Sequence, residues 1–244
     1  MCTVSWRNLP AGGYELLFNR DEQRARSAAS ETERHESEGV MWVAPKDPVS
    51  DGTWIACTAA GITFALLNWY GVPAERAPAP RQSRGSLIPV LCEARSPEEA
   101  WRRVASLDLV PFAPFHLLIF SLGEEPRLFG WDGHRRHEPP LTRRMWTSSS
   151  FDTARVIGWR QALFDRLESE GALAAGLDPF QCWHDADAKA ESVLMERADA
   201  CTVSQTRIHV AADRATLEYT PRRGLEQTGS THVASLPLRI PEQP

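Results

Sequence analysis

The sequence lacks several features that would place it in common classes of protein. No apolar run approaches the roughly 20 residues of a membrane-spanning helix. Arg7 and the charged residues 19–21 interrupt any stretch that could form the apolar core of a secretory signal. Basic residues (27) are fewer than acidic ones (32), and the net charge of −5 opposes binding to a phosphate backbone. We therefore expect a soluble, cytoplasmic protein with no membrane span and no nucleic-acid partner.

Cysteine is scarce and scattered, which argues against both a disulfide framework and a zinc site. The five cysteines are Cys2, Cys57, Cys92, Cys182 and Cys201. Their number is odd and no pair has CxxC spacing, which is typical of reduced thiols in a cytosolic compartment. His134 and His137 are the nearest approach to a metal pair, but no carboxylate or cysteine stands at a supporting spacing. We predict no metal and no cofactor.

The first 22 residues carry the strongest local pattern. Two short apolar runs, residues 2–6 and 14–18, flank a segment dense in turn residues at 8–13. This arrangement predicts a β-hairpin, which brings the start of its first strand close to the end of its second. Cys2 is therefore expected to lie across from Asn19-Arg20-Asp21-Glu22.

The position of Cys2 gives this cluster a chemical interpretation. A small second residue permits removal of Met1, which leaves Cys2 with a free α-amine. Such an amine titrates at roughly 7.7 to 8.0 and can act as general base for the thiol of its own residue. Arg20 would favour the thiolate, and Asp21 could orient the amine. The alternative is an ordinary buried cysteine beside a charged loop.

The rest of the chain predicts an α+β protein. Strands are expected at 40–44, 53–58, 63–68, 115–121, 127–131, 202–210 and 216–220, and helices at 83–92, 96–107 and 152–170. Residues 22–38 are interpreted as a loop. Hairpins separated by groups of helices favour helices layered on antiparallel sheets. We assign residues 1–220 to a single domain and 221–244 to a loosely packed tail.

Several motifs together resemble a known family. Asn19-Arg20-Asp21-Glu22 after an N-terminal Met-Cys, with further matches at 52–55, 61–68 and 83–85 and a weaker one at 202–206, resembles the NRDE family, which includes the transport and Golgi organisation 2 proteins. That family is similar to N-terminal nucleophile hydrolases of the penicillin V acylase and bile salt hydrolase type. The resemblance implies a four-layer αββα sandwich, and it implies that Cys2, Arg20, Asp21 and Asn68 occupy site positions.

Two positions depart from the pattern or leave it open. In the bile salt hydrolase type a later strand end carries an Asn that helps to form the oxyanion hole, whereas this chain has Ser148 and Ser149. A late Arg also supports the nucleophile in related hydrolases, and Arg197 and Arg207 are both candidates. We include Ser149 and Arg207 in the predicted site.

The resulting hypothesis is a cysteine N-terminal nucleophile hydrolase that cleaves a linear amide, with a small-molecule amide or lipid-like substrate. The alternative is a non-catalytic binding or trafficking protein on the same scaffold, handling lipid or haem, which the serines at 148 and 149 favour. A haem protein with a His or Cys axial ligand has no supporting motif. Nothing in the sequence specifies an oligomeric state.

Overall fold

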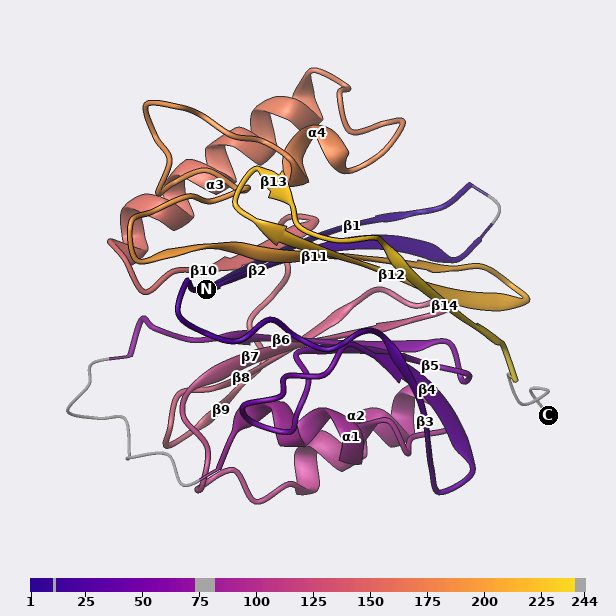
Figure 1. Ribbon diagram of the computed structural model, residues 1–244. Helices are drawn as coiled ribbons and strands as arrows, with labels where there is room; N and C mark the ends of the chain where they lie inside the picture. Colours follow the sequence, from indigo (N-terminus) through magenta and orange to yellow (C-terminus); the bar gives the residue numbers. More distant parts are fainter. Residues whose placement is uncertain (11, 73–81, 240–244) are drawn as a thin grey trace.

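The computed structural model describes residues 1–10, 12–72 and 82–239, and they form four layers (Figure 1). Two seven-stranded antiparallel sheets face each other, and helices cover the outer face of each sheet. The predicted α+β fold, a four-layer αββα sandwich, is confirmed. No helix in the described ranges has the length and apolar character needed to cross a membrane.

The first sheet contains both ends of the described chain. Its strand order is β10-β1-β2-β11-β12-β13, with β14 also paired to β12. The bounds are β1 (Cys2–Asn8), β2 (Tyr14–Gln23), β10 (Met145–Ser148), β11 (Ala200–Val210), β12 (Arg214–Arg223), β13 (Glu226–Gln227) and β14 (His232–Pro237). The predicted hairpin is β1–β2, and its register sets Cys2 opposite Arg20. On its other side Cys2 lies opposite Ser148 of β10.

The second sheet is a meander of consecutive strands, β3 to β9. The bounds are β3 (Glu33–Ser37), β4 (Val40–Ala44), β5 (Ile55–Thr58), β6 (Ile62–Asn68), β7 (Phe115–Ser121), β8 (Arg127–Trp131) and β9 (Arg136–His137). Strands β5, β6 and β7 are buried along nearly their whole length, because one face meets the other sheet and the other meets helices. β6 ends at Asn68, as predicted.

Helices close the outer faces. The 3-10 turn η2 (Arg84–Ser86), α1 (Leu87–Leu91) and α2 (Pro97–Ser106) cover the second sheet, and α3 (Thr153–Ser169) and α4 (Asp178–Gln181) cover the first. α2 begins as its sequence predicts, with the Ser96 hydroxyl accepting a hydrogen bond from the Glu99 N–H and Pro97 in the first turn. The buried face of α3 combines Val156, Leu163 and Leu167 with a fully buried Arg160.

Alternation along β1 and β2 divides their side chains between two environments. Val4, Leu16 and Phe18 point between the sheets into the main apolar core. Thr3, Ser5 and Asn19 point the other way, toward α3 and α4, where they are buried and bond with polar side chains or carbonyls. Because successive residues of a strand face opposite sides, Arg20 extends toward the second sheet and Asp21 toward the helices.

Two segments differ from the sequence prediction. The expected loop at 22–38 contains β3, whose five residues are all exposed or partly exposed and carry little apolar signal. The expected loose tail at 221–244 contains β14, which pairs with β12 from Arg214 to Tyr219. Ala234 and Leu236 of β14 are buried in the core between the sheets, so the chain is packed at least to this strand.

Candidate active site

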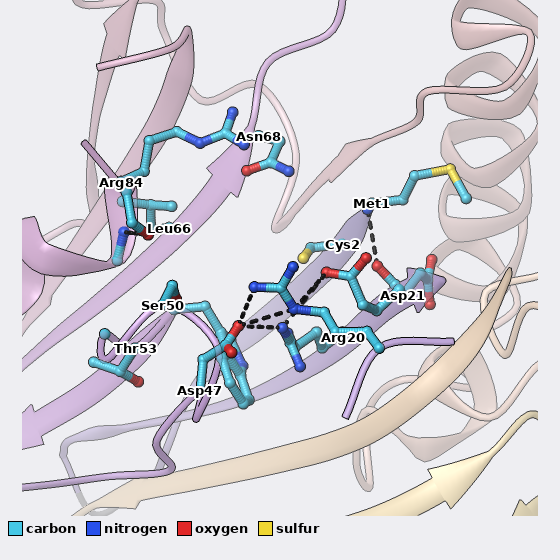
Figure 2. Close-up of a pocket in the computed structure, with 16 residues that line it drawn as sticks. Met1, Cys2, Arg20, Asp21, Asp47, Ser50, Thr53, Leu66, Asn68 and Arg84 are labelled. Atoms are coloured by element: carbon cyan, nitrogen blue, oxygen red, sulfur yellow. Dashed lines mark hydrogen bonds and ion pairs between the residues drawn. The ribbon is translucent and has the colours of Figure 1, made fainter. Parts of the chain in front are cut away.

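A pocket of about 290 Å³ lies over the N-terminus of the chain (Figure 2). The structure brings Cys2, Arg20, Asp21 and Asn68 to the lining of this one pocket, together with Met1, Asp47 and Arg84. The first three residues meet through the β1–β2 register, whereas Asn68 arrives from the end of β6 in the opposite sheet. The pocket therefore lies between the two sheets, as expected for a site assembled by the sandwich.

Cys2 is held by strands on both sides. Its backbone N–H donates a hydrogen bond to the Ser148 hydroxyl at 3.2 Å, and its side chain is only 8% exposed. Burial raises the pKa of the Cys2 thiol, because the thiolate loses hydration. The N-terminal ammonium and Arg20 act in the opposite direction. With Met1 in place the thiol is therefore mainly protonated at neutral pH.

Arg20 is fixed by groups from the second sheet. Its Nη2 lies 2.8 Å from Oδ2 of Asp47, and its guanidinium stacks 4.2 Å from the centre of the Trp54 ring. Asp47 also binds Arg26 at 2.7 Å. Burial would raise the pKa of Asp47, but hydrogen bonds from Arg26 and the Val49 N–H, with the charge of Arg20, hold that pKa below its usual value. The carboxylate is thus charged and keeps Arg20 beside Cys2.

Asp21 faces the helix layer and meets a buried arginine there. Its Oδ2 lies 3.4 Å from Nη2 of Arg160, and its Oδ1 accepts a hydrogen bond from the Thr202 hydroxyl at 2.7 Å. Both side chains of the ion pair are fully buried. Burial raises the pKa of Asp21, opposed by the charges of Arg160 and the N-terminus. Arg160 stays protonated although burial lowers its pKa.

Arg160 also ties together several parts of the chain. Its guanidinium donates to the hydroxyls of Thr3 and Thr147 at 2.6 and 3.1 Å. It also donates to the carbonyls of Glu191 and Ser192 at 3.0 and 2.8 Å. These partners come from β1, β10 and the segment before β11. Arg160 therefore positions Asp21 and the strand that carries Cys2 at the same time.

Neither of the two late arginines named from the sequence lines the pocket over Cys2. Arg207 binds Glu15 and Asp178, with its Nη2 2.7 Å from Asp178 Oδ1, and it does not line the pocket. Its predicted place beside the nucleophile is corrected, because β11 sets it opposite Leu17, well along β2 from Arg20. Arg197 pairs with Asp199, and its Nη1 lies 3.9 Å from the Met1 sulfur. The arginine in contact with Asp21 is Arg160, and an Arg on the apolar face of a helix was the signal for it.

Met1 occupies a fitted place above Cys2. Its ammonium donates to the Asp21 carbonyl at 2.9 Å, and its carbonyl accepts from the Asp21 N–H at 2.8 Å. Its side chain packs with Met195 and Ala200, and its sulfur accepts a hydrogen bond from the Ser149 hydroxyl at 3.1 Å. Ser149 thus contacts Met1, whereas its neighbour Ser148 contacts Cys2.

Asn68 stands where two pockets adjoin. Its amide donates to the Tyr70 hydroxyl at 2.7 Å. Besides the pocket over Cys2, it lines a second pocket of about 360 Å³ that is walled by aromatic rings. The residues that define this aromatic pocket include Trp69, Tyr70, His116, Trp146, Ser148 and Ile157. An amide at this junction can donate hydrogen bonds to a carbonyl oxygen bound near Cys2.

Comparison with known families gives a match over most of the chain. A family model described as Transport and Golgi organisation 2 matches residues 1–156. The chain belongs to the transport and Golgi organisation 2 family. No curated protein matches it.

Several solved structures share the fold of this member of the transport and Golgi organisation 2 family. An N-acylethanolamine-hydrolyzing acid amidase ortholog from Caenorhabditis elegans superposes with a TM-score of 0.57 at 10% identity, covering 85% of this chain and 92% of the other. Penicillin V acylase from Agrobacterium tumefaciens gives 0.53 at 15% identity, covering 96% and 91%. A C2A mutant of conjugated bile acid hydrolase from Clostridium perfringens gives 0.55 at 12%, covering 97% and 92%. At these identities the likeness establishes the fold.

Proposed function

We propose that this protein is a cysteine N-terminal nucleophile amidohydrolase that cleaves the C–N bond of a linear amide after removal of Met1. The observation that carries the proposal is the meeting of Cys2, as second residue, with Arg20, Asp21 and Asn68 at one open pocket. The three structural neighbours described above are named as an acid amidase, a penicillin V acylase and a conjugated bile acid hydrolase, and they share the fold.

Removal of Met1 would change the groups around the thiol. The Cys2 nitrogen, now an amide N–H that donates to Ser148, would become an α-amine. The Asp21 N–H and carbonyl, which now pair with Met1, would lose those partners. An α-amine is partly neutral near pH 7.7 to 8.0. The amine would therefore take the thiol proton, with Ser148 and Asp21 available to orient it.

The reaction then runs in two steps. Cys2 Sγ attacks the substrate carbonyl, an S–C bond forms and the C–N bond breaks, and the thiol proton passes through the α-amine to the leaving nitrogen. Water next attacks the thioester, the S–C bond breaks, and a proton returns to Sγ as the acid leaves. Arg20 stabilises negative charge at sulfur. Asn68 donates to the oxyanion, an interaction that is stronger in the transition state than in the ground state.

A binding role on the same scaffold is the second candidate, and one observation favours it. Met1 is buried, its ammonium and sulfur both have hydrogen-bond partners, and Cys2 has a raised thiol pKa. A chain that keeps Met1 would have no α-amine at Cys2 and therefore no internal base. Under this reading the pocket would bind a small molecule without cleaving it.

Two measurements decide between these candidates. The intact mass of the protein from its native host would lack Met1 in the hydrolase and retain it in the binding protein. At neutral pH, a limiting alkylating reagent would modify a catalytic Cys2 faster than the exposed Cys182, because the thiolate is the reactive form. In a screen of linear amides, Cys2→Ala should abolish turnover and Cys182→Ala should leave it unchanged. An active Cys2→Ala protein would refute the proposed mechanism.

A further inference from the structure

Arg84 differs from every other charged side chain at the pocket over Cys2. Arg20 and Arg26 each pair with Asp47 and Glu22, and Asp21 pairs with Arg160. Within the described ranges, Arg84 has no carboxylate within salt-bridge distance. Its guanidinium donates from Nη1 to the carbonyl of Pro114 at 2.9 Å. Among the described residues the pocket thus holds one arginine without an ion-pair partner.

The position of Arg84 directs that charge at the reacting centre. It opens η2, after the cap at Ser83, and it lines the pocket over Cys2 together with Asn68 (Figure 2). Arg84 is partly buried, and burial lowers the pKa of its guanidinium, which means that its charge has lost hydration. A desolvated arginine with free N–H groups is a strong site for a carboxylate or a similar anion.

The neighbouring aromatic pocket supplies the opposite environment. Trp69 stacks on His116 with ring centres 4.3 Å apart, and Trp146 packs edge-on against His116 at 5.1 Å. Ser148, which accepts the Cys2 N–H, lines this pocket, and Asn68 lines both. An amide held between Cys2 and Asn68 therefore has an apolar space on one side and an unpaired cation on the other.

Resting on the proposed hydrolase function, we propose that the substrate is an amphiphilic amide, with an apolar chain in the aromatic pocket and an anionic group bound by Arg84. The anion lies a few bonds from the scissile amide, because Arg84, Asn68 and Cys2 line one pocket of about 290 Å³. Carboxylate and sulfonate share the required charge and acceptor oxygens. Arg84 is then the residue that determines substrate specificity.

The test compares anionic substrates with neutral isosteres of the same shape. One pair is N-decanoylglycine and N-decanoylisobutylamine, which places the anion on the leaving amine. The reversed pair is N-decylsuccinamic acid and N-decylisocaproamide, which places it on the acyl side, and N-decanoyltaurine tests sulfonate. We expect kcat/KM to favour the anionic member of at least one pair by about 10- to 100-fold, the usual range for hydrogen bonds to a charged group.

Variants of Arg84 test whether this residue causes the preference for the anionic substrate. Arg84→Gln should lower kcat/KM for the anionic member far more than for the neutral isostere, so that the preference disappears, and Arg84→Lys should retain most of the preference because the charge remains. Arg143→Gln, which alters a surface arginine paired with Asp165, is the control for loss of positive charge. Thermal melting checks that each variant is folded. Turnover with equal kcat/KM for anionic and neutral members of both pairs would overturn the inference.

The outcome in which no amide is hydrolysed is separate. It would refute the proposed function, and calorimetric binding of the same compounds to the full chain would then test Arg84 alone. Arg84-dependent binding of the anionic members supports anion recognition at this pocket. Equal binding of anionic and neutral members, or binding that Arg84→Gln and Arg84→Lys leave unchanged, overturns it.

Discussion

The two pockets that Asn68 lines differ in the charge of their side chains. The pocket over Cys2 gathers acidic and basic side chains from both sheets, and among the described residues all of them except Arg84 have an ion-pair partner. The aromatic pocket excludes charge, and His116 is held neutral among Trp69 and Trp146. Charge is therefore concentrated where the thiol lies and removed from the space beside it. This division is what a site for an amphiphilic molecule needs.

Among substitutions near the pocket over Cys2, we expect the largest effect on stability from breaking the Asp21–Arg160 ion pair. Arg160→Met leaves the Asp21 carboxylate buried without its cation, which typically costs about 3–5 kcal/mol. We expect a loss of that size in the free energy of unfolding measured with urea. The double variant Asp21→Asn with Arg160→Met should recover much of it, because both charges are gone. An Arg160→Met variant as stable as the wild type would show that this ion pair does not stabilise the folded protein.

The next largest effect is expected on kcat when Asn68, which lines both pockets, is replaced. Asn68→Ala removes the proposed oxyanion donor, and losing one such donor typically lowers kcat by about 100- to 1,000-fold. Stability should change little, since in the described part of the chain the Asn68 side chain forms one hydrogen bond, to Tyr70. Tyr70→Phe removes the partner of that bond while keeping the amide, and we expect a clearly smaller loss of kcat. Equal losses in the two variants would mean that Asn68 acts through Tyr70.

The aromatic side can be tested by filling it. Ile157 reaches this pocket from α3, and Ile157→Trp should leave less room for a long chain. We expect kcat/KM for N-decanoyl substrates to fall by about 10- to 100-fold and that for N-butanoyl substrates to stay nearly constant, consistent with the selectivity available to apolar pockets. Ala154→Trp, on the exposed side of the same helix, is the matched control. Equal losses for both chain lengths would contradict an apolar chain in this pocket.

Local sequence patterns predicted that Cys2 and Arg20 meet, but they did not predict the partners of Arg20 and Asp21 from other layers. The β1–β2 hairpin follows from turn residues and short-range alternation, and it alone places Cys2 opposite Arg20. Asp47 reaches Arg20 from a loop of the other sheet, and Arg160 reaches Asp21 from a helix 139 residues away in sequence. Those meetings depend on how layers pack, which no local pattern specifies.

The choice of Arg207 shows the same limit from the other direction. The sequence predicts a strand at 202–210, and the structure has β11 there. The register of β11 against β2, however, cannot be predicted from local sequence. Ser204 lies opposite Arg20, and Arg207 lies opposite Leu17, three residues further along. At about 3.3 Å per residue the offset is roughly 10 Å, which is enough to take Arg207 to Glu15 and Asp178.

The smallest expected effect is a change in the pH dependence of stability, which tests whether the aromatic pocket keeps His116 uncharged. Burial lowers the pKa of His116 from 6.5 to about 4, with a further contribution from His137, which itself bonds Asp132 at 2.8 Å. Because the unfolded chain binds this proton first, the His116 contribution is complete above about pH 6.5 and is lost as the pH falls toward 4. The free energy of unfolding should fall by up to about 1.4 kcal/mol per pH unit across that window. His116→Gln should flatten the slope by that amount in urea unfolding at successive pH values, and parallel curves for the two proteins would show that His116 takes up its proton in the folded state.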